Sequence, residues 1–203
     1  MSQTSNLQKG ALVSIAAGGP QTSIPFQYNP DTLRRSLTPQ LVGGQQNDRS
    51  LMVRFAGAPV ETISVEVELD YVDAAQVANA TLPSMGVYPL LYALEVLAYM
   101  PSATVDANAA LLATGTLDVA PAPAPLTLFV WGQQRVVPVA IQSYAITEQA
   151  FDSYLTPIRA VVALELRVLS YSDLSTTNPG YTQFMVYQQN KESLAALLPR
   201  SPM

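Results

Sequence analysis

The feature that most limits the fold of this chain is a run of strict alternation at residues 62–71. Five apolar and five polar side chains take turns there: Ile63, Val65, Val67, Leu69 and Tyr71 against Thr62, Ser64, Glu66, Glu68 and Asp70. Successive side chains of a β-strand point to opposite faces of the sheet. The segment is therefore predicted to be a half-buried antiparallel strand, with one face on the core and one face in water.

Other segments repeat this period of two, so the sequence predicts a mainly β fold. A second long strand is expected at residues 158–169, where Ala160, Val162 and Leu164 begin an apolar row. Shorter strands are predicted at residues 11–17, 24–28, 32–38, 51–55, 126–131 and 135–144, the last two as a hairpin. Residues 43–50 are predicted to form a loop, and residues 147–156 to be irregular.

One segment shows convincing helical spacing. Pro89 suits a first helical turn, and Leu90, Leu91, Leu94, Leu97 and Ala98 then recur at the spacing of one helix face, until Pro101 ends the run. We expect this helix, at residues 89–100, to flank an antiparallel β-sandwich or barrel. Residues 102–125, rich in Ala, Thr and Pro, are predicted to be a long, partly extended connection.

The last part of the chain is more polar than the rest. The break at residues 178–180 (NPG) separates it into a predicted short strand at 181–187 and a short helix at 191–198. We expect a β domain at residues 1–170 and a C-terminal extension at 171–203. Leu194, Leu197 and Leu198 form an apolar stripe that must dock, on its own domain or on another chain, because so short a helix is unstable alone.

Composition limits the partners. Only 12% of the residues are charged and 49% are hydrophobic, and the charged share is about half that of an ordinary soluble domain. A surface with so little charge indicates extensive contact with other protein chains. The net charge of −5 argues against a phosphate-binding surface, so nucleic acid is not an expected partner.

The sequence offers little for catalysis. It has no histidine and no cysteine, which excludes Ser-His-Asp and Cys-His catalysis and sites with histidine or thiolate ligands. Glu66, Glu68 and Asp70 could hold a divalent cation, but a solvated strand face is the favoured interpretation. Glu165 is better explained by ion pairing across strands than by acid catalysis. We expect no enzyme activity, no cofactor and no metal.

The N-terminal residues predict the compartment. Residues 1–10 are polar and lack the basic start and apolar stretch of a signal peptide. The longest apolar run, residues 87–100, contains Pro89 and Glu95 and is shorter than the roughly 18–20 residues of a membrane helix. We expect cytoplasmic assembly and no direct membrane insertion.

Several motifs occur in a fixed order. They are residues 26–30 (FQYNP) with Leu33, residues 53–57 (VRFAG), residues 61–70, residues 128–132 (LFVWG) and residues 157–160 (PIRA). In this order they resemble the tube-type baseplate proteins of extracellular contractile injection systems, which are related to phage tail-tube initiators. The resemblance covers residues 10–170. Phe151 supplies the aromatic residue of the family before the last motif, whereas Leu155 stands where the family has Gly.

The resemblance implies a tail-tube-like fold and a structural role. Six copies would join edge to edge into a ring at the baseplate hub of a phage tail-like particle, connecting the inner tube protein to the spike and wedge proteins. Exposed strand edges, a liability in a monomer, would become the assembly surface. The candidate interface residues are Arg34, Arg35, Glu66, Glu68, Asp70, Leu194, Leu197 and Leu198.

Two alternatives remain open. The first is an ordinary inner-tube subunit of the same machine, although residues 102–125 and the tail favour the hub adaptor. The second, from another class, is a carbohydrate-binding β domain, against which the missing signal peptide counts. Residues 184–187 and 192–197 resemble the first strand and helix of the LysM module that many relatives carry. Because no Gly-Asp-Thr turn or second helix follows, we expect no sugar binding by the tail.

Overall fold

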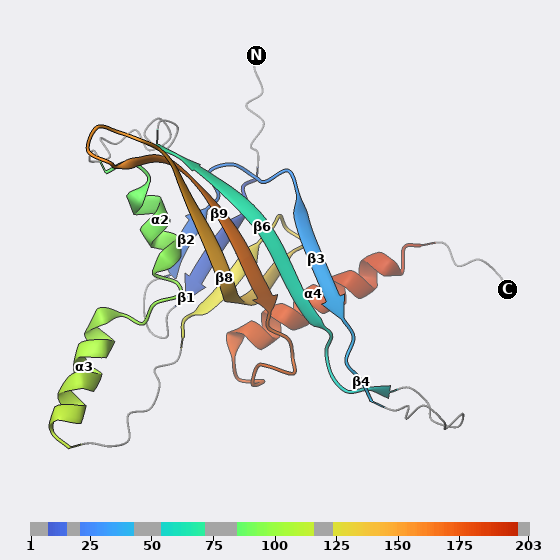
Figure 1. Cartoon of the computed structure of the whole chain (residues 1–203). Helices are drawn as coiled ribbons and strands as arrows, with labels where there is room; N and C mark the ends of the chain where they lie inside the picture. Colours follow the sequence, from blue (N-terminus) through green and yellow to red (C-terminus); the bar gives the residue numbers. More distant parts are fainter. Residues whose placement is uncertain (1–7, 16–20, 43–53, 72–84, 116–123, 199–203) are drawn as a thin grey trace, which may run out of the picture.

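The computed structural model describes residues 8–15, 21–42, 54–71, 85–115 and 124–198 (Figure 1). The main strands are β1 (Ala11–Ile15), β2 (Gln21–Pro25), β3 (Leu33–Thr38), β6 (Val60–Asp70), β7 (Leu126–Val130), β8 (Val136–Phe151) and β9 (Pro157–Val168). They form one antiparallel sheet in the order β2-β1-β7-β8-β9-β6-β3. A separate two-stranded pair consists of β4 (Leu41–Val42) and β5 (Arg54–Phe55). The predicted mainly β fold is confirmed.

Strand β6 shows the predicted alternation. Its apolar side chains at residues 63, 65, 67 and 69 are buried, whereas Glu66 and Glu68 are exposed. The apolar row continues across the sheet, because Val65 lies opposite Leu164 and Val67 lies opposite Val162 of β9. The register predicted for this strand is therefore confirmed.

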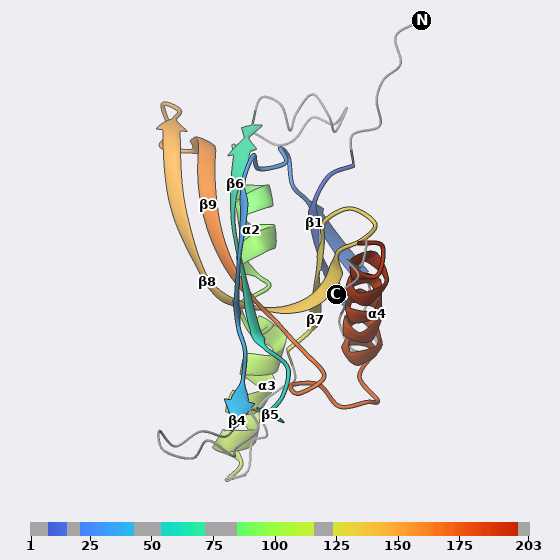
Figure 2. The ribbon, with the colours of Figure 1, turned by 90° about the vertical axis from the view of Figure 1, so that its right-hand side faces the viewer.

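Strand β8 gives the sheet its shape. Its first residues pair with β7, most of its length pairs with β9, and the register shifts between Ile141 and Ser143. An irregularity of this kind bends a strand and increases its twist. The two parts of the sheet consequently face each other as two layers (Figure 2). The fold is sandwich-like and not a closed barrel, since β2 and β3 are its two edges.

Two details of the predicted strands differ. The predicted hairpin is present as β7 and β8, but residues 147–151, expected to be irregular, continue β8 in register with β9. The predicted loop at residues 43–50 and the first part of the predicted strand at 51–55 lie outside the described residues.

The core lies between the two layers and is closed by helices. Phe26 and Phe129 are almost fully buried there, with their ring centroids 6.2 Å apart. Helix α2 (Tyr88–Glu95) adds Leu91 and Leu94. It is the helix expected from the spacing after Pro89, although it ends at residue 95 and not at 100.

Helix α3 (Ser102–Ala113) corrects the sequence-based expectation for this region. Residues 102–125 were expected to be a partly extended connection, yet the first twelve residues are helical. Alanine is the best helix former, and the prolines that suggested extension stand only before and after this segment. No residue of α3 is buried within the chain.

Helix α4 (Pro179–Ala195) corrects a second expectation, the short strand at residues 181–187. Asn178 caps the helix, since its side-chain oxygen accepts a hydrogen bond from the Gly180 N–H at 2.8 Å. Phe184 and Tyr187, three residues apart, lie on one helix face and join the core. The described residues therefore contain three helices of eight residues or more, where one flanking helix and a short C-terminal helix at residues 191–198 were expected.

Candidate assembly surfaces

The outer face of the layer β3-β6-β9-β8 is polar. Side chains that point away from the core on these four strands are mostly small or charged, and we call them the polar face: Arg34, Ser36, Thr62, Ser64, Glu66, Glu68, Asp70, Ser143, Ala145, Thr147, Gln149, Arg159, Val161, Ala163, Glu165 and Arg167. Each is assigned by its register with the strand beside it. The face is continuous over four strands because every strand contributes alternate residues.

Charges of both signs are distributed over the polar face. The Arg159 guanidinium donates to Asp70 Oδ2 at 2.8 and 3.1 Å. At the other end of β9, Arg167 pairs with Asp173 at 2.6 Å. The Ser143 hydroxyl donates to Glu165 Oε2 at 3.3 Å. Exposed pairs of this kind contribute about 0–1 kcal/mol each, so they order the surface more than they stabilise the fold.

Two of the candidate acids line a pocket. Glu66 and Glu68 form one side of this pocket and the turn at residues 28–32 forms the other. The pocket has a volume of about 550 Å³. Within the residues that the structure describes, no group of three or more carboxylates is arranged to hold a metal ion. Among these same residues, no helix combines the length and the apolar character needed to cross a membrane.

The two ends of the same layer carry exposed apolar side chains. At one end, the turn between β8 and β9 presents Tyr154 and Leu155, which are 88% and 76% exposed. At the other end, the β4–β5 pair presents Leu41 and Phe55, the latter 82% exposed. Strand β6 runs from one end to the other (Figures 1 and 2). We call these the two end surfaces of the layer.

The β8–β9 turn is held by one carboxylate. Asp152 Oδ1 accepts hydrogen bonds from the N–H groups of Tyr154 at 2.8 Å and Thr156 at 2.9 Å. The bond from Thr156 is the main reason that the pKa of Asp152 lies below its ordinary value. Leu155, where the resembled family has Gly, takes a φ of 63°. The turn thus keeps a backbone conformation that favours glycine, with a leucine in it.

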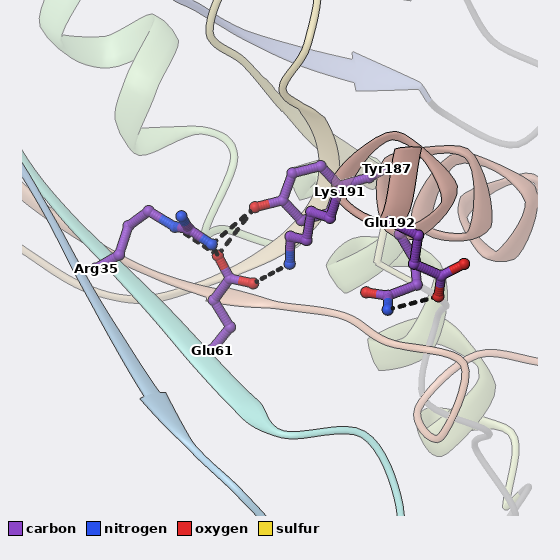
Figure 3. A network of polar contacts seen from close by, with 6 residues as sticks. Arg35, Glu61, Tyr187, Lys191 and Glu192 are labelled. Carbon is purple, nitrogen blue, oxygen red and sulfur yellow. Dashed lines mark hydrogen bonds and ion pairs between the residues drawn. The ribbon is translucent and has the colours of Figure 1, made fainter. Parts of the chain in front are cut away.

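A buried network joins α4 to the sheet (Figure 3). Glu61 is only 3% exposed. Its Oε1 accepts from Arg35 Nε at 2.8 Å and from the Tyr187 hydroxyl at 3.2 Å, and its Oε2 pairs with Lys191 Nζ at 3.2 Å. Arg35 also donates to the Tyr187 hydroxyl at 2.9 Å. The Lys191 ammonium lies 3.9 Å from the centre of the Tyr187 ring.

The network perturbs the protonation of its members. Burial raises the pKa of the Tyr187 hydroxyl above its ordinary value, and the Glu61 carboxylate raises it further. Burial lowers the pKa of Lys191, and attraction to Glu61 opposes this decrease. One buried carboxylate therefore has two cations and a hydroxyl around it, which is the arrangement that makes a buried charge tolerable.

The predicted interface residues fall in different places. Arg34 lies on the polar face, as do the three acids at residues 66, 68 and 70. Arg35 points the opposite way, into the network with Glu61. Leu194, Leu197 and Leu198 are exposed at the end of α4.

Glu61 and Tyr187 were missed in the sequence. Glu61 lies one step before the alternating run, at a position whose parity places it on the apolar face with Ile63. This parity was the sequence signal that could have identified Glu61 as a buried carboxylate, although it does not identify the partners of Glu61.

Comparisons with known proteins give little. No family model and no curated protein matches the chain. Among solved structures, the chain is similar to the tail of an empty GTA particle with C6 symmetry. The two share 12% identity over 78% of this chain and 90% of that chain, with a TM-score of 0.30. A likeness at this score carries no argument about function.

Proposed function

We propose that this chain is a structural, non-catalytic subunit of a contractile injection system, and that six copies form a ring at the baseplate hub. The polar face carries this proposal: it covers four neighbouring strands and is backed by a continuous apolar core. A sheet with one wet face and an edge on each side suits the wall of a water-filled channel. The order of motifs from FQYNP to PIRA supports the same class of protein.

The two sheet edges provide the lateral contact. Strands β2 and β3 lie at opposite edges of the seven-stranded order, and the outer backbone groups of an edge strand are free to pair with another strand. A contact between the β2 side of one copy and the β3 side of the next is heterologous, and such contacts close into a ring when the rotation allows.

The remaining surfaces give the ring its neighbours. We assign the two end surfaces, around Phe55 and around Tyr154, to the inner tube protein and the spike protein. The exposed leucines at residues 194, 197 and 198 are assigned to the wedge proteins. Exposed apolar side chains that gather in one place mark surfaces that contact other proteins.

Native mass spectrometry and electron microscopy of the purified protein test the proposal. The expected result is a closed ring with a mass of six chains. Long tubes without added partners would favour the ordinary inner-tube subunit instead. A protein that stays monomeric over the whole concentration range and in the presence of tube protein would contradict the ring.

A further inference from the structure

Helix α3 buries none of its residues against the described part of its own chain. It carries a single charged residue, Asp106, and its other side chains are mainly alanine, leucine and valine. None of its residues is buried, and Val105 and Leu112 are 50% and 57% exposed. The ribbon shows α3 projecting from the body beyond α2 (Figure 1).

Such a helix is not stable in water by itself. Isolated helices shorter than about 12–15 residues are marginal even when rich in alanine, and α3 has twelve residues. Eight of its twelve side chains are apolar and are distributed around the helix, and a helix with apolar side chains all round is normally buried. The segment therefore needs a covering surface that the described part of its own chain does not supply.

An apolar groove of matching character lies at the base of α3. It has a volume of about 450 Å³, and side chains from α2, from the segment that follows α2, and from β1 and β2 form its walls. Its lining consists of Ser14, Thr22, Tyr92, Ala93, Val96, Leu97, Tyr99, Pro101 and Pro125. No charged side chain of the described residues lines it. Tyr92, Val96 and Tyr99 are at least half exposed within the single chain.

Helix α3 of the same chain does not occupy this groove. Pro101, the residue before α3, lines the groove and has an extended backbone, with ψ of 133°, and the helix then projects from the body (Figure 1). No residue of α3 lines the groove.

Within one ring every copy would present one projecting helix and one open groove, so a single rotation brings each helix to the next groove. The groove also includes Thr22 of β2, the edge strand assigned above to the contact between copies.

We propose that α3 of one copy lies in the groove of the neighbouring copy, so that the ring is closed by exchanged helices as well as by strand edges. This inference rests on the proposed ring. Val105, Ala109 and Leu112 share one helix face at spacings of four and three residues, and this face contacts Tyr92 and Val96 of the neighbour. The occupant of the groove is thus a second copy of this chain.

Cysteine cross-linking tests the exchange, because the chain has no cysteine of its own. One full-length chain carries Leu112→Cys, and a second chain, extended by a tag to change its size, carries Val96→Cys. The two are mixed before assembly, oxidised and run on a non-reducing gel. The expected product is a covalent heterodimer that reducing agent removes. The matched control is Ala110→Cys, on the opposite side of α3, which should give at least ten times less heterodimer.

The other outcomes overturn the proposal. If a chain carrying both Leu112→Cys and Val96→Cys forms only an internal bridge, α3 folds back on its own groove. If rings form and no cross-link appears either between the two single-cysteine chains or within the double-cysteine chain, another surface covers α3. Electron microscopy of the same samples counts rings separately. Exchanged helices would cross-link open oligomers as well as rings. A heterodimer without rings therefore contradicts only the ring, and rings without a heterodimer contradict only the helix exchange.

Discussion

At the scale of single residues, the most consequential side chain is Glu61. It is a carboxylate on the apolar face of β6, and its three partners come from β3 and α4. Removing one member of a buried charged network costs more than the network contributes as a whole, because the remaining charges lose their partners. Glu61 therefore determines where α4 docks, independently of how much net stability it provides.

The substitution Tyr187→Phe tests this role. It keeps the ring in the core and under Lys191, but removes the hydroxyl that donates to Glu61 and accepts from Arg35. We expect a loss of about 1.5–3 kcal/mol in the free energy of unfolding, the range for hydrogen bonds to charged groups. Urea denaturation at pH 7 measures it. An unchanged midpoint would show that the hydroxyl contributes nothing.

The same variant reports a pH dependence. The folded-state pKa of Tyr187 lies above its ordinary value, so the stability linked to this group is fully present below the unfolded pKa of about 10. It is lost as the pH rises through the folded-state pKa. The difference between wild type and Tyr187→Phe should therefore be constant from pH 7 to 9 and should decrease above about pH 10. Lys191 titrates in both proteins and serves as the common background.

Leu155 is the second residue with a defined prediction. Its φ of 63° costs a non-glycine residue about 1–2 kcal/mol, and its side chain is mostly exposed. Leu155→Gly relieves this strain, and the greater freedom of glycine in the unfolded chain offsets part of the gain. We expect a stability increase of up to about 1 kcal/mol. Leu155→Val, which is β-branched, is the control and should destabilise. Thermal unfolding compares the three proteins.

At the scale of elements, the strands were predictable from sequence, whereas of the two later helices only the end of α4, residues 191–195, falls in a predicted helix. Period-two alternation in β6 and β9 is a local pattern that directly reports which side faces the core. Helix α4 gave no comparable signal, because Phe184 and Tyr187, with the partly buried Met185 beside them, are its only residues in the core cluster, too few to set a helical period. In helix α3 polar and apolar side chains are mixed around the helix, so it shows no amphipathic periodicity.

Among the candidate sites, too, some follow from a local sequence pattern and others depend on tertiary packing. The polar face followed from the alternation, since residues 66, 68 and 70 share the parity that points away from the core. The Glu61 network could not be found by pattern alone, because it joins residues more than one hundred positions apart. The apolar groove beside α2 depends in the same way on how helix and sheet pack.

Two truncations separate the roles of α4. Ending the chain after Asn178 removes Phe184 and Tyr187 from the core and leaves Glu61 buried without two of its partners. We expect this protein not to fold, as judged by loss of cooperative unfolding. Ending it after Lys191 keeps these contacts and removes the exposed leucines at residues 194, 197 and 198.

The longer truncated protein should fold and form rings, but no longer bind the wedge proteins. Co-purification with wedge proteins measures this. If it binds them as the full chain does, the end of α4 is not the connector.

At the scale of the whole molecule, the proposed contacts point in different directions. The sheet edges meet neighbours within the ring, and the two end surfaces lie at opposite ends of β6 (Figure 2). Phe55 and Tyr154 are more than four-fifths exposed in the single chain, so substituting them should change the free energy of unfolding by less than about 0.5 kcal/mol. Phe55→Ser and Tyr154→Ser therefore test the contacts along the ring axis, because neither substitution should affect folding or ring closure.

We expect both variants to form rings of wild-type mass by native mass spectrometry. Each should lose one axial partner: one variant should fail to co-sediment with the inner tube protein, and the other with the spike protein, because each end surface loses its largest apolar anchor. Val186→Ser, an exposed apolar position on α4, is the matched control and should retain both partners. Loss of ring closure in either variant would place that end surface between copies of the chain. If both variants keep both partners, the end surfaces do not bind the inner tube and spike proteins. The polar face would then still form the wall of a ring, but the ring would bind these proteins through another surface.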